Sequence, residues 1–92
     1  MREGEMDDQI RKILSEHARL PIDIYDLRDE ADLYQAGMTS HASVNVMLAL
    51  EDTFGIEFPD SLLRKSTFES IGAIRAAIYD LSMAGALQDD HH

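Results

Sequence analysis

The chain has 92 residues and a formal net charge of −10, because 18 acidic residues outnumber eight basic ones. This charge argues against nucleic acid and anionic membranes as partners, since both repel a polyanion, and it favours a partner with a basic docking patch. The chain contains no cysteine, so it has neither a disulfide framework nor a thiol of its own.

The first predicted element is an amphipathic helix over about residues 7–18, in which Ile10 and Ile13 lie at helical spacing. Asp7 stands at the expected N-cap of this helix. Pro21 ends it, because the residue before a proline is driven out of the α region.

A long connection follows, over about residues 19–38. Ile22 and Ile24 alternate as in a strand, but no second alternating run could pair with them, so we predict no sheet. The connection also contains five acidic residues. Their pattern lacks the alternating acids, central glycine and terminal glutamate of an EF-hand loop. We therefore predict a solvated loop without a metal site, with weak divalent binding as the alternative. These residues are Asp23, Asp26, Asp29, Glu30 and Asp32.

A second helix is predicted over residues 40–54, with Gly55 just past its end. Glycine suits this position because it adopts a left-handed backbone without steric cost. Asp60 is placed to cap a short third helix that contains Leu62 and Leu63.

A fourth helix is predicted to open with a capping box, from Ser66 to Glu69. Gly85 marks its latest end, and we expect the tail over residues 85–92 to be disordered. One face of this helix carries apolar residues at helical spacing, namely Ile71, Ile74, Ile78 and Leu81.

Together these elements predict one all-α domain with its core over about residues 7–81. The architecture is a small four-helix bundle with a long first loop and a short third helix. No apolar run is long enough to cross a membrane, and residues 1–5 lack the centre of a signal peptide. We expect a monomer in the cytoplasm.

The outward face of the second helix carries His41, Val44 and Leu48, with acidic residues such as Glu51 at its border. Small apolar anchors inside a charged rim suit a transient docking surface. The alternative is that these are ordinary exposed residues without a binding role, since single apolar side chains are common on protein surfaces.

Ser40 lies where the loop becomes the second helix. Its hydroxyl either caps the helix or, if Thr39 is the cap, projects outward from the first turn. An anionic group esterified to Ser40 would lie in the favourable field of the helix N-terminus. Ser40 and His41 do not form a nucleophile–base pair, because adjacent helical residues point in different directions. We predict no enzymatic activity.

Three segments resemble those of acyl carrier proteins in the same order. They are Gly37-Met38-Thr39-Ser40, Leu50-Glu51-Asp52-Thr53-Phe54 and Ser66-Thr67-Phe68-Glu69-Ser70-Ile71. The resemblance covers about residues 7–81 and implies the four-helix fold of that family. It also implies that a phosphopantetheinyl transferase attaches 4′-phosphopantetheine from coenzyme A to Ser40.

Two departures separate the chain from bacterial fatty-acid carriers. Those usually have Asp-Ser-Leu at the attachment site, where this chain has Thr39-Ser40-His41, and their second helix is more acidic. The chain is more similar to small aminoacyl carrier proteins, which synthetase-like ligases charge. The resemblance thus implies a carrier that delivers an acyl or aminoacyl thioester between partner enzymes.

The resemblance also implies the partners, which are the transferase and a ligase or acyltransferase with a basic docking patch. We expect docking on His41, Val44, Leu48 and Glu51. The identity of the cargo stays open. A helical interaction module without a prosthetic group is the alternative function, and it would use the same face of the second helix.

Overall fold

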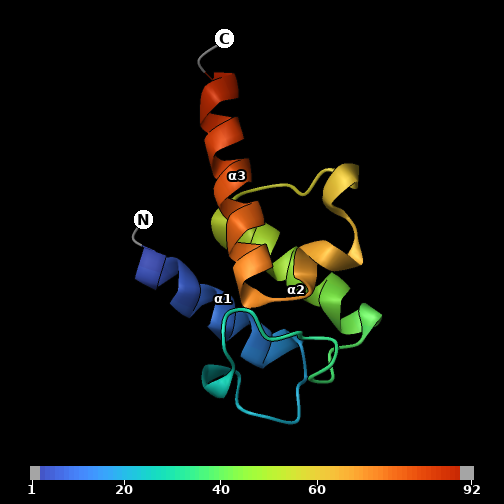
Figure 1. The fold of residues 1–92 in the computed structure, drawn as a ribbon. Helices are drawn as coiled ribbons and strands as arrows, with labels where there is room; N and C mark the ends of the chain where they lie inside the picture. Colours follow the sequence, from blue (N-terminus) through green and yellow to red (C-terminus); the bar gives the residue numbers. More distant parts are fainter. Residues whose placement is uncertain (1–2, 90–92) are drawn as a thin grey trace.

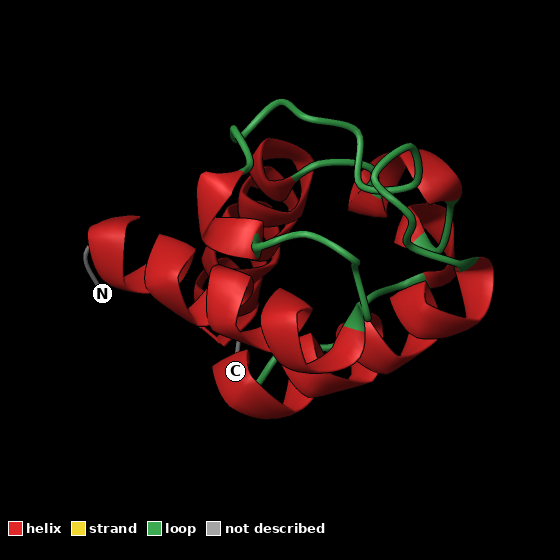
Figure 2. Cartoon of the chain, turned by 90° about the horizontal axis from the view of Figure 1, so that it is seen from below, coloured by secondary structure: helices red, strands yellow, loops and turns green. Residues whose placement is uncertain are grey.

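The computed structural model describes residues 3–89, in which helices are joined by loops and there is no strand (Figures 1 and 2). The predicted all-α class is therefore confirmed. The elements are α1 (Glu3–His17), η1 (Ile24–Asp26), α2 (Ser40–Phe54), η2 (Asp60–Leu62), η3 (Lys65–Phe68) and α3 (Ile71–Asp89), where η marks a short 3-10 helix.

The predicted third helix is not an α-helix. Its residues form a short 3-10 helix, η2, and a second one, η3, covers the predicted start of the fourth helix, so the described residues contain three α-helices rather than four. Asp60 is the first residue of η2 and not its cap, a position that Pro59 occupies. Thr67 and Phe68 in η3 are buried, and the Phe68 ring lies 5.2 Å from that of Phe58. η3 is therefore anchored in the core, whereas η2 has no buried residue; short 3-10 helices of this kind are common connectors.

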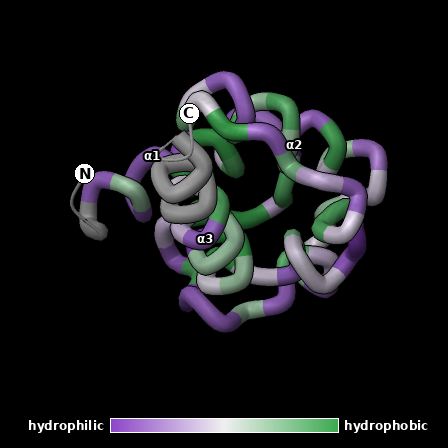
Figure 3. Tube along the Cα trace, turned by 90° about the horizontal axis from the view of Figure 1, so that it is seen from above, coloured by the Kyte–Doolittle hydropathy of each residue, from purple (hydrophilic) through white to green (hydrophobic). Residues whose placement is uncertain are grey.

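The core lies between the three α-helices and is mostly aliphatic, as predicted from the composition. Hydrophobic and hydrophilic stretches alternate along the trace in Figure 3, as expected of amphipathic helices. The predicted apolar face of α3 is confirmed, since its three isoleucines are fully buried and Leu81 packs against the core. The largest fully buried side chains are Ile10, Leu14, Leu33, Val46, Leu50, Ile71, Ile74 and Ile78.

α1 begins earlier than predicted, at Glu3 instead of about Asp7. Asp7 is therefore inside the helix, where its carboxylate binds a side chain of α3 instead of capping α1. The helix ends at His17, and Arg19 adopts a left-handed backbone with φ of 56°. This agrees with the predicted end before Pro21.

α3 differs from its prediction at both ends. The expected capping box at Ser66 is wrong, because the hydroxyl of Ser70 accepts the hydrogen bond from the amide of Ala73 at 3.0 Å. α3 also continues past Gly85 to Asp89, since one glycine costs a helix only about 1 kcal/mol. The last three residues of the expected disordered tail, 90–92, lie outside the described residues.

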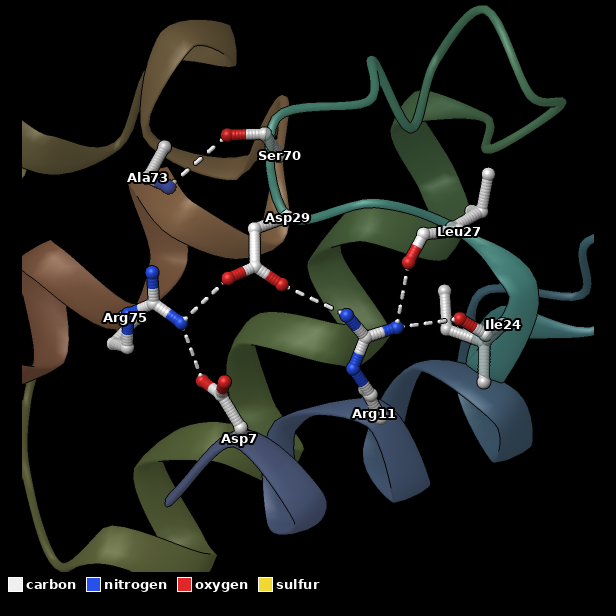
Figure 4. A network of polar contacts seen from close by, with 8 residues as sticks. All are labelled: Asp7, Arg11, Ile24, Leu27, Asp29, Ser70, Ala73 and Arg75. Carbon is white, nitrogen blue, oxygen red and sulfur yellow. Dashed lines mark hydrogen bonds and ion pairs between the residues drawn. The ribbon is translucent and has the colours of Figure 1, made fainter. Parts of the chain in front are cut away.

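The long connection between α1 and α2 is held by the guanidinium of Arg11, which donates to the carbonyl oxygens of Ile24 and Leu27 at 2.7 and 2.9 Å. It also binds Asp29 at 2.8 Å. Asp29 forms a second ion pair with Arg75 of α3, in which Oδ2 of Asp29 lies 3.0 Å from Nη1 of Arg75 (Figure 4). The loop is thus fixed to two helices.

The predicted solvated loop is confirmed for four of its five acids, which are exposed, and is wrong for Asp29, which is half-buried. Three of the acids also make contacts within the chain. Asp29 bridges two arginines, Asp23 accepts from the amide of Tyr25, and Asp32 accepts from the amides of Tyr34 and Gln35. A carboxylate next to backbone N–H groups that have no helical partner satisfies them locally, so these acids shape the loop.

Candidate functional site

Ser40 is presented at the N-terminus of α2 because Thr39 is the N-cap. The Thr39 hydroxyl accepts a hydrogen bond from the amide of Ala42 at 3.0 Å, and its carbonyl oxygen accepts one from Ser43 at 2.9 Å. Ser40 is exposed, and no described residue makes a hydrogen bond to its hydroxyl oxygen. Of the two alternatives, the structure therefore has Thr39 as the cap and the Ser40 hydroxyl projecting outward.

The turn before Ser40 is built around Gly37. Its φ of 124° is one that L side chains rarely adopt, and a Cβ there would lie 3.0 Å from Cδ of Pro21. The turn is anchored by Leu33, which is fully buried and donates its amide to the Glu69 carbonyl at 2.7 Å. The position of Ser40 is thus fixed by the core and by α1–α2 loop contacts.

A surface pocket of about 320 Å³ lies beside Ser40, between α2 and the segment that contains η3. We call it the Ser40 pocket. Its walls are largely apolar, with two basic side chains and no acidic one. Its lining residues are Tyr34, Ser40, Ser43, Val44, Met47, Leu63, Arg64, Lys65 and Phe68.

The outward face of α2 lies as the sequence predicted. His41 is exposed, and Val44 and Leu48 expose 50% and 53% of their surfaces. Glu51 differs from these three, because it is half-buried and accepts a hydrogen bond from the amide of Phe58 at 2.9 Å. Its carboxylate therefore also holds the chain that follows α2.

Sequence reasoning missed the residues that Ser40 meets across the pocket. Tyr34, Arg64 and Lys65 lie 6 to 25 positions from Ser40 along the chain and line the same pocket. The adjacent basic pair in an acidic chain was the available signal. No other periodicity or motif places these residues beside the start of α2.

The arrangement can accept an ester on the Ser40 hydroxyl. The amides of Ser40 and His41 precede the first helical hydrogen bonds, so they are open to an anion at the positive end of the helix dipole. A phosphate esterified to Ser40 therefore fits both the free hydroxyl and its surroundings. Within residues 3–89, no group of His, Asp or Glu side chains could hold a metal ion, and no helix could span a membrane.

Comparison with known proteins agrees with this chemistry. Residues 8–78 match the family described as phosphopantetheine attachment site. An aminoacyl carrier protein of Agrobacterium fabrum (strain C58) is 48% identical over 73 residues, which are 79% of this chain and 88% of that protein.

Solved structures give the same result. One is a crystal structure of an engineered Bradyrhizobium japonicum glycine:[carrier protein] ligase complexed with a carrier protein from Agrobacterium tumefaciens and ATP. The matched chain is 47% identical, with a TM-score of 0.78 and coverage of 80% of this chain and 96% of that one. A solution structure of an A. tumefaciens protein has 42% identity, a TM-score of 0.70 and coverage of 88% and 98%. With the family match over most of its length, the chain belongs to the phosphopantetheine-attachment family of carrier proteins, which carry groups on 4′-phosphopantetheine and are not enzymes.

Proposed function

We propose that this protein is an aminoacyl carrier whose 4′-phosphopantetheine arm is attached to the hydroxyl of Ser40. The observation that supports this residue is its exposed hydroxyl at the start of α2, left free because Thr39 caps the helix. The arm, when bound, supplies the thiol on which a carboxylate is held as a thioester. The chain itself has no cysteine that could do so.

The Ser40 oxygen would form a phosphodiester with the arm while the pyrophosphate bond of coenzyme A breaks and adenosine 3′,5′-bisphosphate leaves, and the hydroxyl proton must leave to a base. His41 is the next residue of the helix, so its ring points away from Ser40 and is not suited to this role. The base is therefore expected on the phosphopantetheinyl transferase, which takes the arm from coenzyme A. The chain's part is to hold the hydroxyl in place at a helix end that favours the new negative charge.

The partner that loads the carrier is proposed to be an ATP-dependent aminoacyl ligase with a basic docking patch. The relative with 48% identity is named an aminoacyl carrier protein, and a similar carrier is solved with a glycine:[carrier protein] ligase. The net charge of −10 supports a basic patch on the partner through electrostatic steering. Glycine is the proposed cargo, because the ligase solved with the similar carrier is named for glycine.

Docking is proposed on the outward face of α2, through His41, Val44, Leu48 and Glu51. Val44 and Leu48 are half-exposed apolar side chains one turn apart, which suits a weak contact that forms and breaks quickly. We further propose that the carrier is a monomer and works in the cytoplasm, where coenzyme A and ATP are available to its partners.

The test of the attachment residue is the intact mass after incubation with coenzyme A and a phosphopantetheinyl transferase. The wild-type chain should gain the mass of one arm, and Ser40→Ala should gain none. Ser43→Ala is the matched control, because Ser43 lines the same pocket one turn later, and it should be modified like the wild type. A modified Ser40→Ala variant would reject this residue. If the chain never gains the arm, and the Ser40→Ala variant binds the partner protein as tightly as the wild type does, the protein is an interaction module instead.

A further inference from the structure

The two basic side chains beside Ser40 form an unusual patch in this acidic chain. Arg64 and Lys65 are two of only eight basic residues, and no acidic side chain lines the Ser40 pocket with them. In the part of the chain that the structure describes, the ion pairs are made by Arg11 and Arg75, and none involves Arg64 or Lys65. The charge of Arg64 and Lys65 is therefore available to an anion.

The contacts of Arg64 and Lys65 direct these side chains without neutralising them. Nε of Arg64 donates to the Ser61 carbonyl oxygen at 2.9 Å, and Nζ of Lys65 lies 4.8 Å from the centroid of the Tyr34 ring. A guanidinium has five N–H donors and an ammonium three, so both groups keep donors for a further acceptor. Tyr34 also lines the Ser40 pocket, so its ring stabilises the ammonium group of Lys65 next to this pocket.

The remaining walls of the Ser40 pocket are apolar. Val44, Met47, Leu63 and Phe68 supply these apolar walls. An apolar groove with a positive rim fits an occupant that has one anionic end and a less polar remainder. A 4′-phosphopantetheine arm on Ser40 has this chemistry, and its phosphate would be attached at the edge of the pocket.

We propose that Arg64 and Lys65 bind the phosphodiester of the arm and so hold the arm along the Ser40 pocket between deliveries. This inference rests on the proposed attachment at Ser40. Because the arm is tethered, binding is intramolecular, and even weak contacts populate the bound state. Exposed ion pairs are weak, so the arm is released readily when a partner enzyme competes for it.

The test compares the apo and holo forms of each variant by NMR, with the arm confirmed by intact mass. In the wild type, attachment should shift the amide signals of residues 63–68 and broaden the phosphorus signal of the arm. In the Arg64→Gln/Lys65→Gln variant, we expect both effects to fall about fivefold. In the wild type they should weaken with added salt.

The matched control is the Lys12→Gln/Arg28→Gln variant. It loses the same two charges from exposed positions that do not line the Ser40 pocket, and it should behave like the wild type. Equal apo–holo differences in the wild type and in Arg64→Gln/Lys65→Gln would overturn the proposal. So would a loss of equal size in both double variants. A chain that never gains the arm mass would instead refute the attachment at Ser40, so the two failures are distinguishable.

Discussion

Asp29 joins the long loop to two helices, and its removal should measurably destabilise the protein. Its carboxylate binds Arg11 of α1 at 2.8 Å and Arg75 of α3 at 3.0 Å. Because its side chain is 38% exposed, each contact lies near the range of surface ion pairs, about 0.5–1 kcal/mol. The two contacts together are therefore worth about 1–2 kcal/mol.

The Asp29→Asn variant should lose about 1 kcal/mol, at the lower end of this range, because neither arginine is left without a partner. Arg75 keeps its ion pair with Asp7 at 2.7 Å, and Arg11 keeps its two backbone carbonyls. For a domain of this size, 1 kcal/mol lowers Tm by about 4–8 °C. Urea unfolding followed by far-UV circular dichroism at pH 7 measures the difference. Asp26→Asn is the control, since Asp26 is an exposed acid of the same loop.

The effect of Asp29→Asn should also depend on pH. The hydrogen bond from Arg75 lowers the pKa of Asp29, burial opposes this shift, and the charges of Arg75 and Arg11 lower it further. A carboxyl with a lowered pKa in the folded state stabilises the protein above its unfolded pKa, about 3.9. This stabilisation disappears as the pH falls through the lower, folded pKa. The reasoning is refuted if the variant matches the wild type at pH 7, or if their difference does not shrink between pH 5 and pH 2.

Two further substitutions test the presentation and the use of α2. Gly37→Ala should cost about 1–3 kcal/mol, because of its φ of 124° and the contact with Pro21, and it should slow attachment of the arm. Gly72→Ala is its control and should be neutral or stabilising, since a Cβ there meets only ordinary contacts. Urea unfolding measures both variants, and an equal loss of stability in Gly37→Ala and Gly72→Ala would contradict the reasoning. Leu48→Asp should lower kcat/KM of a loading ligase about tenfold, by removing an apolar anchor and adding like charge, with unchanged Tm. If the Leu48→Asp variant is loaded at the wild-type rate, Leu48 is not part of the docking surface.

The sequence was most informative where local chemistry decides the structure. α2 has the predicted bounds, because Thr39 caps its start and Gly55, with φ of 63°, ends it. The start of α1 was predicted late, although Met6 is buried and continues the helical spacing of Ile10 towards the N-terminus. The start of α3 was misplaced because two serines, four residues apart, could both serve as caps; Ser66 lies in η3, and Ser70 accepts the capping hydrogen bond.

Contacts between distant residues could not be predicted from the sequence. Arg75 and Asp7 are 68 positions apart, and no local pattern indicates their pairing. For the same reason, the acids of the loop were expected in solvent, although Asp29 lies between two helices. The Ser40 pocket was missed because its basic rim, Arg64 and Lys65, lies between the predicted third and fourth helices, where no pattern links it to the start of α2.

The cap on Thr39 separates the stability of α2 from the chemistry proposed for its neighbour. If the arm is bonded to Ser40, gaining or losing it breaks no hydrogen bond of the folded chain, because the Ser40 hydroxyl makes none with a described residue. The empty, armed and loaded forms can then share the same start of α2. Enzymes that act in succession would have to tell these forms apart by the tether and what it bears, and not by a change in this helix.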